Sequence, residues 1–187
     1  PGSINTTGGI FCEGWTENIN SNSTASGGSG NYTYTWQRII SGSPGCSGTW
    51  ANIGSSNNPS FNANFPGPGY YCYRRTVTDG CSTESTTEVQ FNIVADLISQ
   101  SPNPTPNTGT VCAGTNVSAQ FTGGGGGAPG LYVDIYEYST NSGGNWSSYT
   151  PGNNISTTGL SGTDVVRIRT RREATGVAGC TFGGYNT

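Results

Sequence analysis

The sequence predicts an all-β protein built from two copies of one β-sandwich module. Three observations support this prediction: the composition disfavours helix, apolar and polar residues alternate in short runs, and landmarks of the first half return about a hundred residues later. The 187 residues include 31 glycines and only 9% charged residues. Glycine costs backbone entropy in a helix, and the many Ser, Thr and Asn side chains compete for backbone hydrogen bonds. Helix is therefore disfavoured throughout the chain.

Alternating runs bounded by turn-rich clusters indicate the strands in order. The runs lie at 32–37, 87–94 and 165–171, and the clusters lie at 41–48, 65–69, 123–130 and 141–145. Aromatic residues make up 11% of the chain and gather in these runs, which indicates a thin core rather than disorder. Short strands at this spacing predict an immunoglobulin-like β-sandwich. Asp134 lies in such a run, and if it points inward, an arginine from 167–172 is its expected partner.

The internal repeat sets the predicted domain boundaries. Two segments of the first half have counterparts in the second: residues 7–12 match 107–112, and residues 32–37 match 132–137. Single landmarks also recur, since Trp50 falls near Trp146 and Cys81 matches Cys180. The pair Arg74 and Arg75 matches the pair Arg171 and Arg172. We expect one module at 1–96, a Pro-rich linker at 97–108 and a second module at 109–187. The second copy has no counterpart of the run at 87–94, so these residues do not supply its last strand. Either the chain continues beyond them, or a strand from an adjoining copy, covalently continuous or a separate subunit, completes the module, with residues 1–9 as the natural donor.

Six cysteines without a CxxC pair or any histidine indicate a disulfide framework in an oxidising compartment. Only Cys12 and Cys81 have counterparts in the second copy, so the repeat predicts Cys12–Cys81 and Cys112–Cys180 as bridges common to both modules. Cys46–Cys72 is then an extra bridge in the first. A rival reading treats Cys72 as the second cysteine of a tyrosine corner and would join it to Cys12, with Trp36 in the core.

The order of these motifs resembles the immunoglobulin-like repeats of large secreted surface proteins of Bacteroidota. These include gliding-motility-associated and adhesin-like proteins exported by the type IX system. The first copy carries the pattern at 12–14, 34–37, 49–53, 71–75 and 80–82, and the second carries a sister version at 112–114, 136–146 and 169–172. The resemblance implies an extracellular or cell-surface location and a structural or adhesive role, but its motifs are structural and imply no ligand.

Several classes of function are excluded or disfavoured. The chain has no His and no Lys, so it lacks the Ser-His, Cys-His and Ser-Lys pairs of nucleophilic catalysis, and we expect no enzyme, no catalytic residue and no cofactor. No metal site is expected, because no zinc-ligand set or calcium-loop spacing occurs. A net charge of −3 with seven scattered arginines gives no footprint for nucleic acid. No apolar run could span a bilayer, and any export signal or anchor is expected outside these residues.

The function that the sequence favours is an extracellular structural or adhesion segment of a repetitive, fibre-forming protein, with self-association or neighbouring repeats as its partners. Strand complementation is expected to join the copies head to tail. The alternative is a glycan-binding β-sandwich module that grips surface glycans by aromatic stacking. Trp15 has no counterpart in the second copy and is the candidate ligand contact, whereas Trp50 and Trp146 are matched across the repeat and are expected to pack against their sandwiches.

Overall fold

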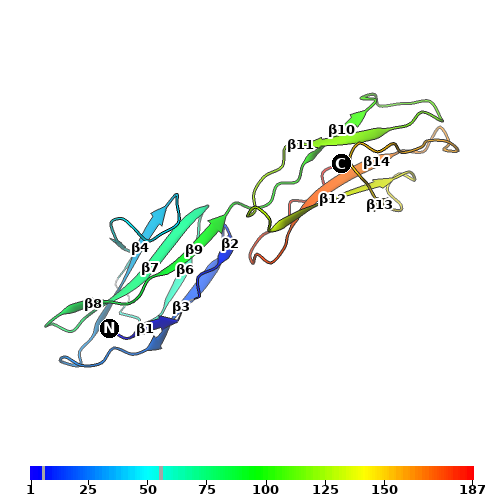
Figure 1. Cartoon of the computed structure of the whole chain (residues 1–187). Coiled ribbons are helices and arrows are strands. Elements are labelled where there is room, and N and C mark those ends of the chain that lie inside the picture. The colour runs from blue at the N-terminus through cyan, green and yellow to red at the C-terminus, as the bar shows by residue number, and fades with distance from the viewer. Residues whose placement is uncertain (6, 55–56) are drawn as a thin grey trace. The chain divides into compact units, whose positions relative to one another are not determined.

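The computed structural model describes residues 1–5, 7–54 and 57–187, and in this part of the chain strands and loops occur without a helix (Figure 1). The predicted all-β class is confirmed. The chain divides into two compact units. The first comprises Pro1–Ala95 together with Val177–Gly179, and the second comprises Asp96–Gly176 together with Cys180–Thr187.

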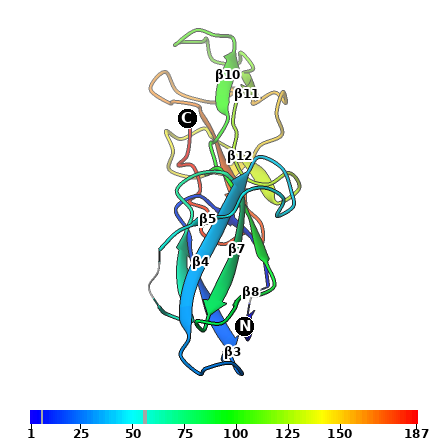
Figure 2. The same ribbon diagram turned by 90° about the vertical axis from the view of Figure 1, so that its left-hand side faces the viewer.

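The first unit contains two sheets. The smaller sheet has the order β1-β3-β6, formed by β1 (Ser3–Asn5), β3 (Thr16–Ser23) and β6 (Phe61–Asn64). The larger has the order β2-β9-β7-β4-β5, formed by β2 (Ile10–Cys12), β9 (Val89–Val94), β7 (Gly69–Thr78), β4 (Thr33–Ser41) and β5 (Ala51–Asn52), with β8 (Thr83–Ser85) also paired to β7. Every pairing is antiparallel except β2 with β9. Figure 2 shows β4 and β7 side by side.

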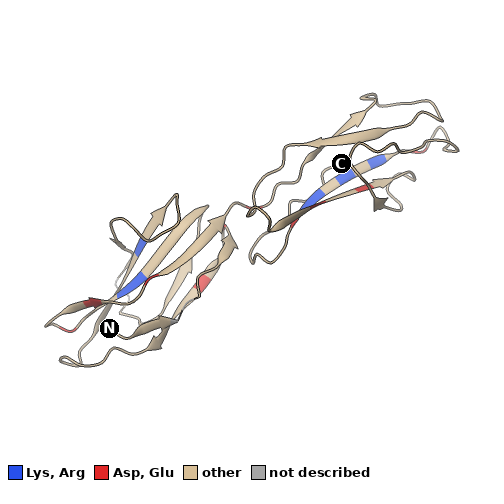
Figure 3. Ribbon diagram, in the orientation of Figure 1, with Lys and Arg blue, Asp and Glu red and all other residues tan. Residues whose placement is uncertain are grey.

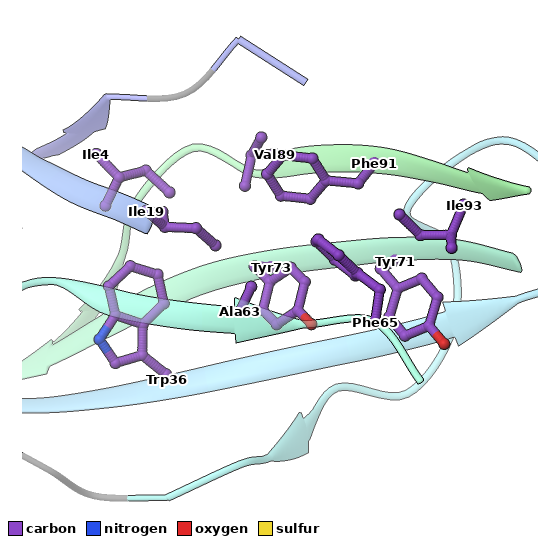
Figure 4. Close-up of a cluster of buried hydrophobic side chains, with 10 residues drawn as sticks. All are labelled: Ile4, Ile19, Trp36, Ala63, Phe65, Tyr71, Tyr73, Val89, Phe91 and Ile93. Atoms are coloured by element: carbon purple, nitrogen blue, oxygen red, sulfur yellow. The ribbon is translucent and has the colours of Figure 1, made fainter. Parts of the chain in front are cut away.

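Side chains from both sheets of the first unit meet in one apolar core (Figure 4). In β9, Val89, Phe91 and Ile93 are buried, and the residues between them are partly exposed. This alternation shows that one face of the strand points into the core. Trp36 of β4 is fully buried, and its indole N–H donates to the carbonyl of Asn58 over 3.1 Å. Aromatic rings supply most of this core's apolar surface, so a chain of modest hydrophobic content still builds it.

The second unit repeats part of this arrangement. One sheet pairs β10 (Ser101–Thr105) with β11 (Ser118–Thr122), and the other has the order β13-β12-β14, formed by β13 (Ser147–Ser148), β12 (Tyr132–Ser139) and β14 (Arg167–Ala174). Its core is smaller and is built on Ala119, Tyr149 and Ile155. The Tyr149 hydroxyl accepts from the Ala119 N–H and donates to the Asn153 carbonyl, both over 2.8 Å, which joins two loops to β11.

The predicted linker at 97–108 is wrong in its central part, because Ser101–Thr105 is strand β10 of the second unit. The prolines of this segment favoured a spacer over a strand, because proline has no N–H group to donate to a neighbouring strand. In this two-stranded sheet, however, β10 has one neighbour, and Pro102 and Pro104 occupy alternate positions opposite Phe121 and Ala119. Their missing N–H groups are tolerated on the edge that faces away from β11.

The expected bridges common to both modules are also wrong. Cys46 and Cys72 form a disulfide, and Cys12 and Cys180 are each disulfide-bonded, but Cys81 and Cys112 are free and exposed. Cys12 is paired to the end of β9 that lies beside Gly69, at the start of β7, whereas Cys81 follows the end of β7. A ten-residue strand spans roughly 30 Å, and a disulfide needs Cα atoms within about 7 Å of each other. Cys12 and Cys81 therefore lie at opposite ends of their module.

The expected donor strand at residues 1–9 is occupied within its own unit. Ser3–Asn5 forms β1 and pairs with β3, and Ile4 is buried in the core of the first unit. The carbonyl of Pro1 accepts a hydrogen bond of 2.9 Å from Arg75. Thr6 lies outside the described residues. This segment is therefore not a free strand that can leave for a neighbour without opening the first core.

Candidate functional site

A groove of about 600 Å³ opens in the second unit between the segment that precedes β11 and the start of β14. Its walls are the prolines of β10, residues 108–113, residues 160–168 and Thr187. The apolar groups in it are Val111, Val117, Leu160, Val165, Val166 and Ile168. None of these six side chains is buried, and Val165 is 47% exposed. The groove is thus apolar surface without a cover among the described residues.

Comparison of the two units explains the groove. In the first unit β9 lies between β2 and β7, and its inward side chains fill the core. In the second unit, within the described residues, β14 ends the sheet and its outer edge carries a single bridge. There Thr170 and Asn186 exchange two backbone hydrogen bonds of 2.9 Å. The groove therefore occupies the place that β9 fills in the first unit.

The Thr170–Asn186 bridge shows which edge of β14 is open to a further strand. The bridge is antiparallel, so each step forward from Asn186 moves one step back along β14. Ile168 lies two residues before Thr170 on β14, and its N–H lies on the same edge as that of Thr170 because strand edges alternate with a period of two. An extended segment in this register would satisfy the edge of β14 and cover Val165 and Val166. The groove can thus accept a β-strand with alternating apolar side chains.

The two units share one arrangement of side chains on the outer face of the larger sheet. In this arrangement, called here the clasp, one arginine stacks on a tryptophan and donates a hydrogen bond to a polar residue. In the first unit Arg74 donates from Nε to Gln37 Oε1 over 2.7 Å, and its guanidinium lies 4.3 Å from the Trp50 ring centre. The corresponding residues of the second unit are Arg169, Glu137 and Trp146, with distances of 2.8 Å and 3.7 Å. The prediction that both tryptophans pack in their modules is confirmed.

The clasp corrects the matching of the arginines. Gln37 faces Arg74 across β4 and β7, and Glu137 faces Arg169 across β12 and β14. Arg74 therefore corresponds to Arg169, two residues before the arginine pair of the second copy. Matching Arg-Arg with Arg-Arg failed because hydrogen-bond register, and not the identity of adjacent residues, determines which side chains lie over the tryptophan.

Two aromatic residues that sequence reasoning missed extend the clasp of the second unit. Tyr185 lies 3.7 Å from the Arg169 guanidinium, on which Trp146 also stacks, and 4.8 Å from Arg171. Phe182 lies 5.9 Å from Arg171. Phe182 is 56% exposed and Tyr185 is 37% exposed. The only signal in the sequence is two aromatic residues within the glycine-rich run at 181–187.

The arginines of β14 form a visible basic band, but carboxylates neutralise three of them (Figure 3). Arg169 pairs with Glu137, Arg171 with Glu173 and Arg172 with Asp134, each at 2.8 Å. The expectation that an arginine of this strand partners Asp134 is confirmed. The hydrogen bond to Asp134 is the main reason that the pKa of Arg172 is raised. The band is therefore a set of ion pairs rather than a positive patch.

Trp15 has a packing environment in the structure. Its ring stacks on Phe11 with centroids 5.7 Å apart, and its indole N–H donates to Glu17 over 3.1 Å. A Cβ added to Gly179 would come within 2.7 Å of the ring, so the backbone passes close to it. These contacts fix Trp15 beside the core of the first unit. Trp15 remains partly exposed, and its predicted role as a ligand contact stays a prediction.

The described residues contain no group of three or more His, Cys, Asp or Glu side chains that could hold a metal ion. None of the described segments is a helix able to span a membrane. No protein-family model and no curated protein matches the chain.

Proposed function

We propose that the chain is an extracellular structural or adhesion segment made of tandem immunoglobulin-like modules that join by strand complementation. The observation that carries the proposal is the open groove of the second unit in the place of β9. The disulfides support an oxidising, non-cytoplasmic environment. A clasp that recurs in both units supports a repeated mechanical module rather than one unit adapted to a ligand.

The strand order of the first unit supports the immunoglobulin-like reading. Its sheets, β1-β3-β6 and β2-β9-β7-β4-β5, have the order A-B-E and A′-G-F-C-C′ of such sandwiches, with the parallel A′–G pair at the edge. In the same terms the second unit supplies A, B, C, C′ and F. Its groove is then the position of strand G, between strand F and the segment at 109–113.

In this proposal the occupant of the groove is an extended strand supplied by an adjoining copy of the module. The strand pairs antiparallel with β14 and places apolar side chains inward at alternate positions, as β9 does in the first unit. Each module that receives a strand in this way is closed, and a free groove remains at the end of the row. The assembly is therefore head to tail and open-ended.

A peptide with the sequence of residues 87–94, TEVQFNIV, tests the proposal directly. We expect it to bind the second unit and to slow hydrogen exchange of the Ile168 amide, which gains a partner on the outer edge of β14. A peptide of the same composition with its apolar residues moved to adjacent positions is the control. A Val166→Asp variant should bind more weakly because it places a charge in the groove. Equal protection by both peptides, or by neither, would refute strand complementation.

The rival function is glycan binding, and the exposed rings of Phe182 and Tyr185 are the observation in its favour. Exposed aromatic faces stack on sugar rings, but here Tyr185 already lies against two guanidinium groups. Glycan-array binding that Phe182→Ala abolishes, and that Trp15→Ala leaves intact, would favour this alternative.

A further inference from the structure

The two copies of the repeat carry cysteines at the same two places, with the same local backbone. Cys12 and Cys112 each begin a turn in which a carbonyl accepts from the residue three positions on: Trp15 N donates to Cys12 O over 3.3 Å, and Thr115 N donates to Cys112 O over 3.0 Å. The glycine two residues after each cysteine has a left-handed backbone, with φ of +82° at position 14 and +87° at position 114. These two cysteines occupy one structural position, called here the entry position.

Cys81 and Cys180 share a second position, called here the exit position, after the long strand of each unit. Cys81 follows β7 and Cys180 follows β14, and each comes directly after a glycine with left-handed backbone, with φ of +85° and +79°. Asp79 fixes the first of these turns, because its Oδ1 accepts from the N–H groups of Cys81 and Ser82 over 2.9 and 3.0 Å. The Cys81 thiol is thus exposed on an ordered turn.

Each position is oxidised in one copy and reduced in the other. At the entry position Cys12 is disulfide-bonded and fully buried, whereas Cys112 is free and exposed. At the exit position Cys180 is disulfide-bonded, whereas Cys81 is free and exposed. The backbone of both positions is therefore compatible with a disulfide, as the bonded copies show. Two exposed thiols in an otherwise oxidised chain point to pairing between chains.

We propose that Cys81 of one chain and Cys112 of a second copy form a disulfide that locks the head-to-tail assembly covalently. This inference rests on the proposed assembly, and it adds the bond that closes each joint. The entry and exit positions lie at opposite ends of a module, so head-to-tail contact brings unlike cysteines together. Cys112 also lines the groove that receives the incoming strand, which places one thiol at the proposed joint.

The bond forms by thiol–disulfide exchange with a small-molecule disulfide such as oxidised glutathione. The thiolate of one cysteine attacks the glutathione disulfide and releases one reduced glutathione, and the partner thiolate then attacks the mixed disulfide and releases the second. The two protein thiols lose two protons and two electrons in total, and one oxidised glutathione becomes two reduced molecules. The disulfides already present in the chain, at Cys12, Cys180, Cys46 and Cys72, take no part in this reaction.

Single-cysteine variants test the pairing. After incubation with oxidised glutathione, the wild-type chain should form a ladder of oligomers on a non-reducing gel, and dithiothreitol should collapse it. C81S and C112S should each stay monomeric, because each retains only one kind of linking thiol. An equimolar mixture of the two variants should form dimers and nothing larger. Protease mapping of these dimers should join the peptide of Cys81 to the peptide of Cys112.

Three outcomes would overturn the inference. The first is dimers of C81S or C112S alone, which would mean pairing of like cysteines. The second is a wild-type monomer with both thiols still open to alkylation, and the third is a wild-type monomer with neither thiol open, which mass spectrometry would assign to closure within one chain or to capping by glutathione. The double variant C81S/C112S separates this inference from the proposed function. If it binds the strand peptide while the wild-type chain forms no ladder, strand complementation stands and the disulfide joint fails.

Discussion

Arg172 donates two hydrogen bonds of 2.8 Å to Asp134, from Nε to Oδ1 and from Nη2 to Oδ2, directly across the β12–β14 pair. The side chains are only 8% and 17% exposed, and the guanidinium also lies 4.0 Å from the ring centre of Tyr132. Such a bidentate pair between a guanidinium and a carboxylate holds the two side chains in one relative orientation and also neutralises their charges. In a unit with a small apolar core, this pair aligns the two longest strands.

We expect Asp134→Ala or Arg172→Ala to destabilise the second unit by about 3 kcal/mol, because each leaves a buried charge without its partner. The double variant should cost less than the sum of the two, which a double-mutant cycle would show. Hydrogen exchange followed by mass spectrometry reports the two units separately. The control is the more exposed pair of Arg171 and Glu173, whose truncation should cost less than about 1 kcal/mol. Equal losses for both pairs would contradict the expected role of burial.

The pKa of Arg172 is raised, chiefly by the hydrogen bond to Asp134, and this gives the pair a defined pH dependence. A group with a raised pKa contributes stability that is present below its unfolded value and is lost as the pH rises through its folded value. The ordinary pKa of an arginine lies well above neutral pH, so the contribution should stay constant from neutral pH to about pH 10. Urea unfolding of the wild type and of Arg172→Ala should therefore differ by the same free energy at pH 7 and pH 9. A gap that narrows at pH 9 would contradict this assignment.

The Cys46–Cys72 disulfide ties the loop between β4 and β5 to the outer face of β7. It closes a segment with a sequence separation of 26, for which chain entropy predicts a loss of about 3.5 kcal/mol on removal. The variant C46S/C72S should unfold in its first unit at lower urea concentration, with hydrogen exchange of β4 and β7 as the probe. Dithiothreitol should lower the stability of the wild type and change the first unit of this variant much less. Identical midpoints for the wild type and the variant would show that the loop is held by its other contacts.

The recurrent clasp predicts unequal effects of two equivalent arginines. Arg74 stacks on Trp50 alone, whereas Arg169 lies between Trp146 and Tyr185 and also pairs with Glu137. Each cation–π contact contributes about 0.5–1 kcal/mol at a partly exposed site. Arg169→Ala should therefore cost its unit about 1 kcal/mol more than Arg74→Ala costs the first unit, as measured by hydrogen exchange. Arg167→Ala, on the same strand but exposed, is the control. A larger loss for Arg74→Ala would contradict this ranking.

Asp79 gives the exit turn of the first unit a dependence on acid pH. Its pKa is lowered below the usual value of 3.8, first by the N–H of Ser82 and then by that of Cys81. A depressed pKa contributes stability that is present above the unfolded value and is lost as the pH falls through the folded value. The stability difference between the wild type and Asp79→Asn should thus be constant at pH 5–7 and should shrink below about pH 4. A difference that persists unchanged to pH 2 would rule out this role for the carboxylate.

The sequence predicted the features that depend on local pattern. Strand period, turn clusters and the repeat predicted the all-β class, because alternation of apolar and polar residues marks each strand without reference to its neighbours. The position of the groove also follows from the repeat, since the run at 87–94 has no counterpart in the second copy. These features need no knowledge of which strands pair.

Features that depend on pairing could not be read from the chain. The Cys12–Cys81 prediction assumed that equivalent cysteines bond within a module, and the length of β7 separates them. Pro102 and Pro104 indicate a spacer by composition, but an edge strand tolerates them equally well. Trp15 has polar sequence neighbours, yet it packs against the core of the first unit and remains only partly exposed. For the cysteines and prolines, strand pairing between segments distant in sequence decided the outcome.

Arg75 is fully buried between the two sheets of the first unit, where a hydroxyl group and backbone carbonyls accept the hydrogen bonds of its guanidinium. Its Nη1 donates to Ser21 Oγ and to the Pro59 carbonyl over 2.8 and 2.9 Å, and its Nη2 donates to the Pro1 carbonyl over 2.9 Å. Burial is the main reason that its pKa is lowered. The side chain thus satisfies oxygen atoms of three separate segments.

Arg75→Met keeps much of the volume and removes every donor, so it should destabilise the first unit by about 2–4 kcal/mol through the oxygen atoms left without partners. The loss should appear first as faster hydrogen exchange in β1 and β3, the strands that the guanidinium holds, while β4 and β7 open only with the whole unit. Arg38→Met, on the neighbouring strand β4 and only partly buried, is the matched control and should change the stability by less than about 1 kcal/mol. If Arg75→Met leaves exchange in β1 unchanged, the buried guanidinium fills space without holding these segments together.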